Sequence, residues 1–393
     1  MKQIKITFSG DIMLHSEMVD LYKKQSGYDF TPIFEDVSEF LKKSDYVVGN
    51  LETPLSFQEA DIKKEKYTFT APEEFAKAIK SSGFNLVSTA NNHCLDNGVT
   101  GVDKTIEVLD SVGLKHTGTF KNNRDVCIEQ IHNLKIAFLS YTYGTNAFNN
   151  KVYLKKSERY KVNLLQNQEL SNRLLRFLYY NKSLFIKILR FVMRKLHIFQ
   201  FQKQPYERIE KKRICEKKLQ NDVKLCKQQN VDYIVVCLHD GGQYNLNPIK
   251  RAKKNMKFLK KIGVDFVVGN HEHRVQKIEK QNYKIFAYCL GNFDGYGGVL
   301  RKPFDKFGEY SLLLNLYLSE KENDSKATVT ILKTIIDPEI DGGVKTTLLY
   351  ELIHKTTNKK ELKKLMDDNQ KIIKIALGRD IDFNDIQVEY EIL

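Results

Sequence analysis

The chain has 393 residues, 41% of them hydrophobic, so it can bury the core of one large α/β domain with insertions, or of two domains. Its 21 glycines and 7 prolines are not in excess, which excludes collagen-like and low-complexity proteins. Of the formal net charge of +14, a surplus of 13 (19 Lys or Arg against 6 Asp or Glu) lies in residues 151–222. This favours a local anionic partner over nucleic-acid binding by the whole protein; nucleic-acid binding by that segment stays open but lacks a recognised motif.

The first residues predict a strand. Residues 4–8 (IKITF) alternate between apolar and polar side chains, and they reach Gly10-Asp11 without an apolar stretch of signal-peptide length. The six cysteines are scattered, and no two have the CxxC spacing of a metal or redox site. We therefore expect reduced cysteines and a cytoplasmic location, with peripheral membrane contact as an alternative.

Four segments then repeat one pattern: a helical period, a turn, a β-branched run and a polar cluster. They are residues 34–52, 72–93, 226–242 and 255–273. Alternating helices and short continuous apolar strands predict an α/β protein with a largely parallel sheet covered on both faces. In such sheets ligands bind beyond the carboxyl ends of the strands, so we expect the polar clusters to converge.

Residues 151–222 interrupt this pattern and predict a basic helical insertion. Residues 170–201 have a helical period, with an apolar face opposite Lys187, Arg190 and Arg194. Charges recur too often for a transmembrane helix. Three readings of the basic face stay open: contact with an anionic membrane, binding of a polyanionic substrate, or a solvated surface.

The remaining segments complete the expected sheet. "EYSLLLNLYL" and "ATVTILKTII", residues 309–318 and 327–336, predict two strands that pair antiparallel. Residues 346–393 carry no chemical motif, and we expect them to form a C-terminal extension that packs on the core.

Polar residues gather at six predicted strand ends. Any one of them has an ordinary structural explanation, but together they include histidines, carboxylates and amides without thiolates, which suits Mn, Fe or Zn. The residues are Asp11, Asn50, Glu52, Asn91, Asn92, His93, Asp96, His239, His271, His273 and Asn292.

The order of these clusters resembles the calcineurin-like metallophosphoesterase superfamily, and more closely its capsule-synthesis branch, the CapA or poly-gamma-glutamate biosynthesis family. The motifs are "SGDIML", "GNLETPLS", "NNHCLDNG", "HDGGQYN", "GNHEHRVQ" and "YCLGNFDG". The resemblance implies a four-layer α/β/β/α sandwich formed by residues 1–150 and 223–345, and a centre with two divalent metal ions.

The resemblance also implies roles for single residues. Asp11 and His273 would bind one ion, Glu52 would bridge both, and Asn92, His239 and His271 would complete the second. His93 would be the catalytic acid or phosphate-contacting residue, oriented by Asp96. Asn50, Asn91 and Asn292 are further candidates for metal or substrate contact.

The sequence departs from the family pattern in three motifs. Met13 replaces a common histidine in the first motif, and His15 is either its substitute, as a metal or substrate ligand, or a surface residue. Gln243 stands in place of a glutamate, and Asn270 and Glu272 replace His and Pro. These changes affect the expected substrate contacts more than the ligand histidines.

The implied activity is metal-dependent hydrolysis of a phosphoester or related bond in capsule or surface-polymer biosynthesis, whether of poly-gamma-glutamate or polysaccharide. The expected substrate is an anionic small molecule or polymer, and contact with a capsule synthesis machinery is also expected. The alternative is a different class of protein, one that contains the metal without catalysing a reaction and that binds or assembles the polymer. Cys94 as a nucleophile beside His93 is a minor alternative, because no second base is evident.

Overall fold

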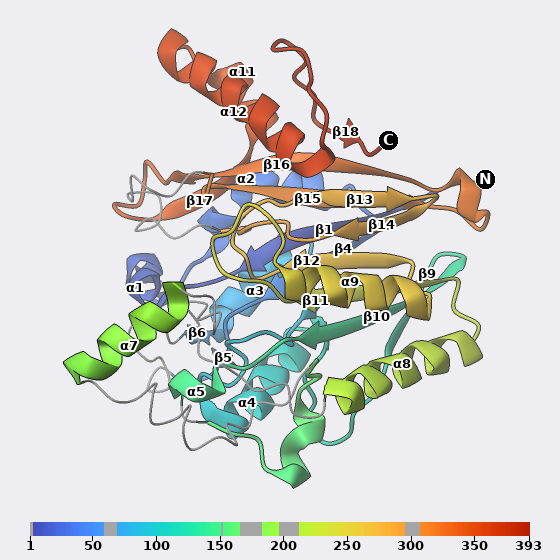
Figure 1. The fold of residues 1–393 in the computed structure, drawn as a ribbon. Coiled ribbons are helices and arrows are strands. Elements are labelled where there is room, and N and C mark those ends of the chain that lie inside the picture. The colour runs from blue at the N-terminus through green and yellow to red at the C-terminus, as the bar shows by residue number, and fades with distance from the viewer. Residues whose placement is uncertain (1–2, 59–68, 151, 166–182, 196–211, 295–306) are drawn as a thin grey trace.

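The computed structural model describes residues 3–58, 69–150, 152–165, 183–195, 212–294 and 307–393. Its fold is mixed α/β with two central mixed sheets, so the predicted class is confirmed (Figure 1). We call the two sheets the large sheet and the small sheet. Two short strand pairs lie outside them: β2 (Lys23–Lys24) with β3 (Gly27–Tyr28), and β5 (Leu55–Ser56) with β6 (Ala71–Pro72).

The large sheet is parallel in one half and antiparallel in the other. The N-terminal strands run parallel, and β15 and β16 pair antiparallel as predicted. Its order is β17 (Val344–Leu348), β16 (Lys326–Ile336), β15 (Tyr310–Leu318), β1 (Ile4–Ile12), β4 (Tyr46–Leu51), β7 (Leu86–Ser88) and β8 (Lys115–Thr117), with β18 (Tyr390–Glu391) beside β16.

The small sheet has four parallel strands between antiparallel edges. The central strands are buried over their whole length, as their unbroken apolar runs predict. Its order is β13 (Ile278–Gln281), β14 (Lys284–Ala287), β12 (Phe266–Asn270), β11 (Tyr233–His239), β10 (Leu134–Thr142) and β9 (Cys127–Ile131).

Helices connect the strands and occupy the outer faces. They begin and end with the expected signals: Glu73 and Glu74 occupy the first turn of α3, and α9 ends at Gly263, whose φ is +85°. The helices are α1 (Ser16–Val19), α2 (Glu35–Leu41), α3 (Glu73–Ser81), α4 (Gly98–Ser111), α5 (Ala147–Asn150), α7 (Leu184–Lys195), α8 (Lys212–Gln228), α9 (Lys250–Ile262), α11 (Leu349–Lys355) and α12 (Lys359–Leu377), with 3₁₀ turns η1 (Asp20–Tyr22), η2 (Thr31–Ile33), η4 (Lys156–Lys161) and η5 (Glu322–Asp324).

The main core lies between the sheets and contains apolar side chains from both. Phe8 of β1 and Phe138 of β10 belong to it, with ring centroids 6.4 Å apart, and Tyr46 of β4 stacks on Phe138 at 5.5 Å. Burying each such ring contributes about 1.5–3 kcal/mol. Side chains of α12 such as Ile372 join the same core.

The outer faces have their own cores. Side chains of α2, α3 and α4 pack against the large sheet, and side chains of α8 and α9 pack against the small sheet. Leu219 and Val223 of α8 are therefore core residues, although they lie in the range 151–222 or beside its end. The last helix of that range therefore packs on the outer face of the small sheet.

Candidate metal centre

Strand register aligns the polar residues at the carboxyl ends of both sheets. In the large sheet Asp11 pairs with Asn50, and Asn50 pairs with Ser88. In the small sheet His239 pairs with Asn270. The two edges meet, because Asn50 Nδ2 lies 3.3 Å from His239 Nδ1.

Five buried side chains form two overlapping groups at this edge. Ligand atoms of Asp11, Glu52 and His239 lie within 4.8 Å of one another, and so do those of Glu52, His271 and His273. None of the five is more than 4% exposed. Glu52 belongs to both groups, so the geometry could hold two cations with this carboxylate between them.

His239 is the member that contacts the most others. Its Nε2 lies 2.6 Å from Asn92 Oδ1, 3.1 Å from His271 Nδ1 and 3.4 Å from Glu52 Oε1. Its Nδ1 is 3.9 Å from Asp11 Oδ1. The imidazole of His239 therefore lies between the residues of both groups.

Unsatisfied polar atoms show that the cluster fits a cation. Both carboxylate oxygens of Glu52 and Nε2 of His271 are buried without a hydrogen-bond partner among the described residues. Such atoms cost free energy unless a ligand satisfies them, and a buried carboxylate needs a positive partner. Nitrogen and oxygen donors without thiolate match Mn, Fe or Zn.

Two of the predicted asparagines hold ligand candidates in place. Asn50 donates to Asp11 Oδ1 at 2.7 Å and accepts from Ser88 Oγ at 2.8 Å. Asn292 Oδ1 lies 2.7 Å from His273 Nδ1. Polar partners of this kind orient the groups that bind a metal and make them more basic.

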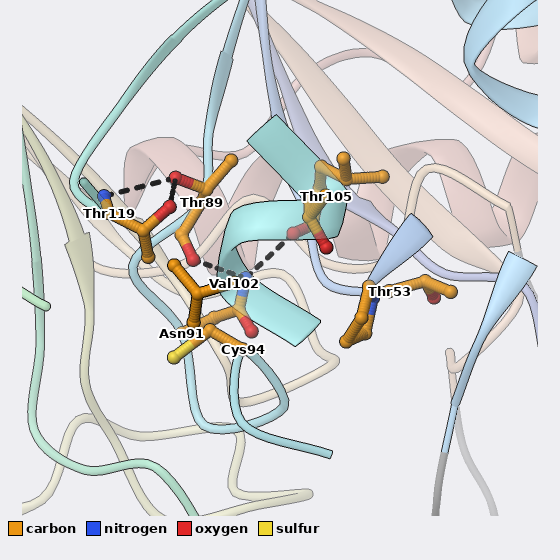
Figure 2. A pocket seen from close by; sticks show the side chains of 9 residues that line it. Thr53, Thr89, Asn91, Cys94, Val102, Thr105 and Thr119 are labelled. Carbon is orange, nitrogen blue, oxygen red and sulfur yellow. Dashed lines mark hydrogen bonds between the residues drawn. The ribbon is translucent and has the colours of Figure 1, made fainter. Parts of the chain in front are cut away.

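Asn91 serves the turn that precedes His93. Its Nδ2 donates to the backbone oxygens of Leu51 and Thr89, and its Oδ1 accepts from the His93 backbone N–H at 3.0 Å. Figure 2 shows Asn91 and Cys94 beside a small cavity lined by nine residues, four of them threonines. Burial raises the pKa of the Cys94 thiol to about 12, so this thiol is uncharged near neutral pH.

The turn with the two histidines has an uncommon backbone. His271 has a φ of +102° and His273 a φ of +56°, values that residues with a side chain rarely adopt. Each such conformation costs of order 1–3 kcal/mol and is maintained only where the surroundings impose it. Here the His271 N–H donates to Asp11 Oδ2 at 3.1 Å, which ties the turn to β1.

His93 forms a pair with Asp96 beside the cluster. His93 Nδ1 lies 2.7 Å from Asp96 Oδ2, which also accepts from the Phe69 backbone N–H. Asp96 Oδ1 accepts from Asn150 Nδ2 at 2.7 Å, and the Phe69 ring lies 4.2 Å from the His93 ring. The carboxylate is thus fixed on three sides, and it fixes Nδ1 of the imidazole.

Neither His15 nor Lys187 belongs to the two ligand groups. His15 packs edge-on against Phe69 at 4.8 Å, on the side of His93. Lys187 is exposed on α7. The side chains of Arg190 and Arg194 lie outside the described part of the chain.

Several residues of the site escaped prediction. Asn150 and Phe69, which hold Asp96, follow no strand-end pattern. Tyr143, whose ring lies 4.7 Å from that of His271, directly follows β10. Asp294 accepts from the Met13 backbone N–H at 2.7 Å and belongs to the strand-end cluster "GNFDG". Tyr143 and Asp294 therefore had a usable signal in their position after an apolar run.

Glu272 packs against Gly241 and belongs to neither ligand group. A Cβ on Gly241 would lie 2.4 Å from Glu272 Oε1, so a larger residue there would have to displace the Glu272 side chain. Burial raises the pKa of Glu272 to about 7. This departure from the family pattern therefore fits the turn at Gly241, which follows His239 in the chain.

Comparison with known proteins gives the family. Residues 5–295 match the family described as bacterial capsule synthesis protein PGA_cap. The chain belongs to this family. The family resemblance inferred from the sequence is thereby confirmed.

Two curated relatives of this PGA_cap chain are named as capsule or PGA biosynthesis proteins. The capsule biosynthesis protein CapA of Bacillus anthracis is 26% identical over 320 residues, which are 79% of this chain and 64% of that protein. The PGA biosynthesis protein CapA of Bacillus subtilis is 25% identical over 318 residues, 79% of this chain and 68% of that protein. The chain thus spans about two thirds of the length of these relatives.

Two solved structures resemble the PGA_cap chain weakly. Sulfate thiohydrolase SoxB of Thermus thermophilus has a TM-score of 0.37 and 10% identity, covering 87% of this chain and 46% of SoxB. The protein TT1561, also of Thermus thermophilus, has a TM-score of 0.36 and 7% identity, covering 83% of this chain and 98% of TT1561.

Neighbouring charges keep one histidine of the metal-binding cluster, His273, protonated near neutral pH. Burial opposes charge on His273, but Glu52 and Asp11 outweigh it and raise the pKa of His273 to about 9. Burial also opposes charge on Glu52, yet His239 and His273 bring the pKa of Glu52 down to about 2. Burial and the neighbouring imidazoles of His239 and His273 lower the pKa of His271. Near neutral pH, the positive charge of protonated His273 therefore balances the negative charge of the Glu52 carboxylate.

We expect metal uptake to release this proton. Nitrogen binds a cation only when deprotonated, so below pH 9 the His273 proton must leave as the ion enters. The apparent affinity for Zn²⁺ should rise about tenfold per pH unit between pH 6 and 8 for one released proton. Calorimetry in buffers of different ionisation enthalpy measures the proton count, and an affinity independent of pH would contradict the assignment.

Proposed function

We propose that this chain is a metal-dependent hydrolase of phosphoester or related bonds that acts in capsule or surface-polymer biosynthesis. The observation that supports it is the buried cluster in which Glu52 joins two ligand groups beside the His93–Asp96 pair. We also propose that the two sheets and their outer helices form the four-layer α/β/β/α sandwich, which the three cores support.

Six residues would hold two divalent ions, Mn, Fe or Zn. When bound, such ions supply positive charge and acidify water in their shell, which lowers the barrier to hydrolysis by several kcal/mol. The chain supplies the polar partners, Asn50 and Asn292, that fix two of these ligands. The ligands would be Asp11, Glu52, Asn92, His239, His271 and His273.

His93 would supply the proton for the leaving group. Burial opposes its charge, but Asp96 and the hydrogen bond to it raise the pKa of His93, which keeps the imidazole protonated to higher pH. With Nδ1 held by Asp96, the proton on Nε2 is the one that can be transferred. Phe69 and Asn150 keep Asp96 in the position that this role requires.

Replacing Asp96 with asparagine should move the alkaline limb of the kcat profile to lower pH. The asparagine removes the negative charge that keeps His93 protonated, so the acid form is lost earlier as pH rises. Because a general acid contributes about 10²–10⁴-fold, we expect kcat at pH 8 to fall by about 10–100-fold. Asp110→Asn, an exposed carboxylate on α4, is the matched control, and an unmoved limb in Asp96→Asn would contradict the role of His93.

For the substrate, we propose an anionic polymer or its phosphorylated precursor. The names of the two relatives refer to capsule biosynthesis and to PGA biosynthesis, which supports poly-gamma-glutamate or polysaccharide metabolism here. The test is metal analysis of the purified chain together with hydrolysis of generic phosphomonoesters and phosphodiesters with added Mn²⁺. Two bound ions with turnover support the proposal. Bound ions without any turnover would favour the non-catalytic polymer-binding alternative, and the absence of ions would overturn both.

We also propose that α7 contacts an anionic membrane peripherally. Its side chains Leu184, Phe185 and Ile188 are between 54% and 74% exposed, and basic residues recur along it. Exposed apolar side chains with basic neighbours on one helix are typical of interfacial membrane binding. Within the described residues, no helix has the length and apolar character needed to cross a bilayer.

Vesicle flotation tests this contact. The chain should float with vesicles that are rich in anionic lipid and stay behind with neutral vesicles, because basic residues add about 1 kcal/mol each near an anionic surface. The double variant Phe185→Ser, Ile188→Ser should lose flotation. Phe57→Ser, an exposed aromatic that is not part of α7, is the control, and equal flotation of all three proteins would remove α7 from the contact.

A further inference from the structure

A second cavity lies where η4 and α8 meet the outer face of the small sheet. Its volume is about 240 Å³. Tyr141, which contributes to its wall, belongs to the outer core of that sheet, whereas the metal-binding candidates lie at the strand ends. The lining residues are Arg124, Tyr141, Lys156, Arg159, Val162, Asn163, Leu164, Ile214, Cys215 and Lys218.

One wall is a fixed network around Arg124. Its guanidinium donates through Nη1 to Asp222 Oδ1 at 3.0 Å and through Nε to Asn163 Oδ1 at 2.6 Å. Nη2 contacts both Tyr141 Oη and the second oxygen of Asp222. The carboxylate of Asp222 thus neutralises Arg124, and the network gives the cavity a rigid polar wall.

Three further cations line the cavity, and the described lining includes no carboxylate. They are Lys156 and Arg159 of η4, and Lys218 of α8. Lys218, Arg159 and Glu216 all act on the Cys215 thiol electrostatically, so the two helices place their charges around a common space. Four cations, including Arg124, thus face two nearby carboxylates, those of Asp222 and Glu216, so the cavity keeps a net positive charge.

The remaining wall is apolar. Val162 is buried, and Leu164 and Ile214 also line the cavity. A ligand that fills it must therefore bring an apolar portion as well as an acidic group. Pockets that bind small molecules combine apolar walls with a few placed polar groups in this way.

We propose that this cavity binds an organic anion, with a phosphate or carboxylate head at Lys156, Arg159 and Lys218 and an apolar body against Val162 and Ile214. Charge-assisted hydrogen bonds from Arg and Lys are the strong contacts for both head groups. The site is separate from the metal cluster and does not depend on hydrolysis. It lies where residues 152–165 and the start of α8 meet the core, within the most basic part of the chain.

Cys215 is a reporter built into this cavity. It is half-buried and lines the site, whereas Cys94, Cys226, Cys237 and Cys289 are buried. The half-buried Cys127 lines a different cavity and gives an internal reference in the same protein. Bound ligand should slow alkylation of Cys215 by iodoacetamide and leave alkylation of Cys127 unchanged, as followed by peptide mass spectrometry.

The test compares four probes on the full chain: hexyl phosphate, hexanoate, inorganic phosphate and hexylammonium. We expect hexyl phosphate or hexanoate to protect Cys215 at least fivefold, and the stronger of the two identifies the head group. Inorganic phosphate should protect less, and hexylammonium not at all. Protection by inorganic phosphate equal to that by hexyl phosphate would overturn the apolar part of the proposal, and no protection by either organic anion would overturn the site.

Charge reversal tests the cationic wall. Lys218→Glu should weaken protection of Cys215 by at least tenfold in ligand concentration. Lys217→Glu is the matched control, because Lys217 is the neighbouring exposed lysine of α8 but lines a different groove. Equal protection in both variants would overturn the assignment of Lys218, and circular dichroism shows whether each variant is folded.

Discussion

Replacing His239 with alanine is expected to abolish metal-dependent hydrolysis, with a fall in kcat/KM of about 10³-fold or more. His239 lies within 3.4 Å of Asn92, His271 and Glu52, so its loss affects both ligand groups at once. A metal centre supplies several kcal/mol of charge stabilisation, and each 1.36 kcal/mol corresponds to a factor of ten in rate. Metal content by mass spectrometry and turnover of a generic phosphodiester measure the effect.

The matched control is His354→Ala. His354 is exposed on α11, where its ring contacts the backbone oxygen of Tyr350, and it lies outside the metal centre. It should keep full metal content and turnover. If His239→Ala retains two ions per chain, the ligand assignment is wrong. If the wild type binds ions without turnover and His239→Ala loses those ions, the non-catalytic polymer-binding alternative is favoured over the hydrolase.

The fold class and the convergence of the polar clusters could be predicted from sequence because both follow from local periodicity. Four αβ units carry helices and strands where the pattern places them, and parallel strands align their carboxyl ends at one edge. Asp11, Asn50 and His239 were predictable for this reason, since each is the polar residue that ends an apolar run.

The supporting residues could not be predicted, because tertiary contacts rather than local patterns place them. Asn150 reaches Asp96 across 54 residues of sequence, and Phe69 reaches it across 27. Neither residue type is unusual in its segment. The same limit applies to Asn50 and Asn292: the pattern places them at strand ends, but only the structure shows that they hold Asp11 and His273.

The basic range 151–222 shows a second limit. Charge alone marks it as one segment, yet Val162 and Leu165 are buried, and α8 covers the small sheet. Lysine and arginine on the solvent side of a helix add charge while its apolar side packs on the core. The surplus charge therefore belongs partly to helices that the core requires, and partly to the cavity at η4 and α8.

Replacing Gly269 with alanine should destabilise the protein by about 3 kcal/mol or more and reduce its metal content. A Cβ at Gly269 would lie 2.0 Å from the backbone oxygen of Tyr288 and 2.7 Å from that of Ala287. No rotamer change relieves a contact with backbone, so β12 or its neighbour must move, which exceeds ordinary overpacking costs of about 1–3 kcal/mol. That movement also displaces the turn with His271 and His273.

The control variant Gly378→Ala shows how much a positive φ alone costs, without the steric clash that an alanine at Gly269 would cause. Gly378 ends α12 with a φ of +69° and has no atom within 4 Å of an added Cβ, so its replacement should cost only about 1 kcal/mol. Gly269 has no such φ, and its requirement is the close approach of β12 to residues 287–288. Chemical denaturation of both variants measures the difference, and equal midpoints would show that the two backbones can separate at no cost. The strand end that carries two metal-binding candidates is therefore fixed by a backbone contact that only glycine permits.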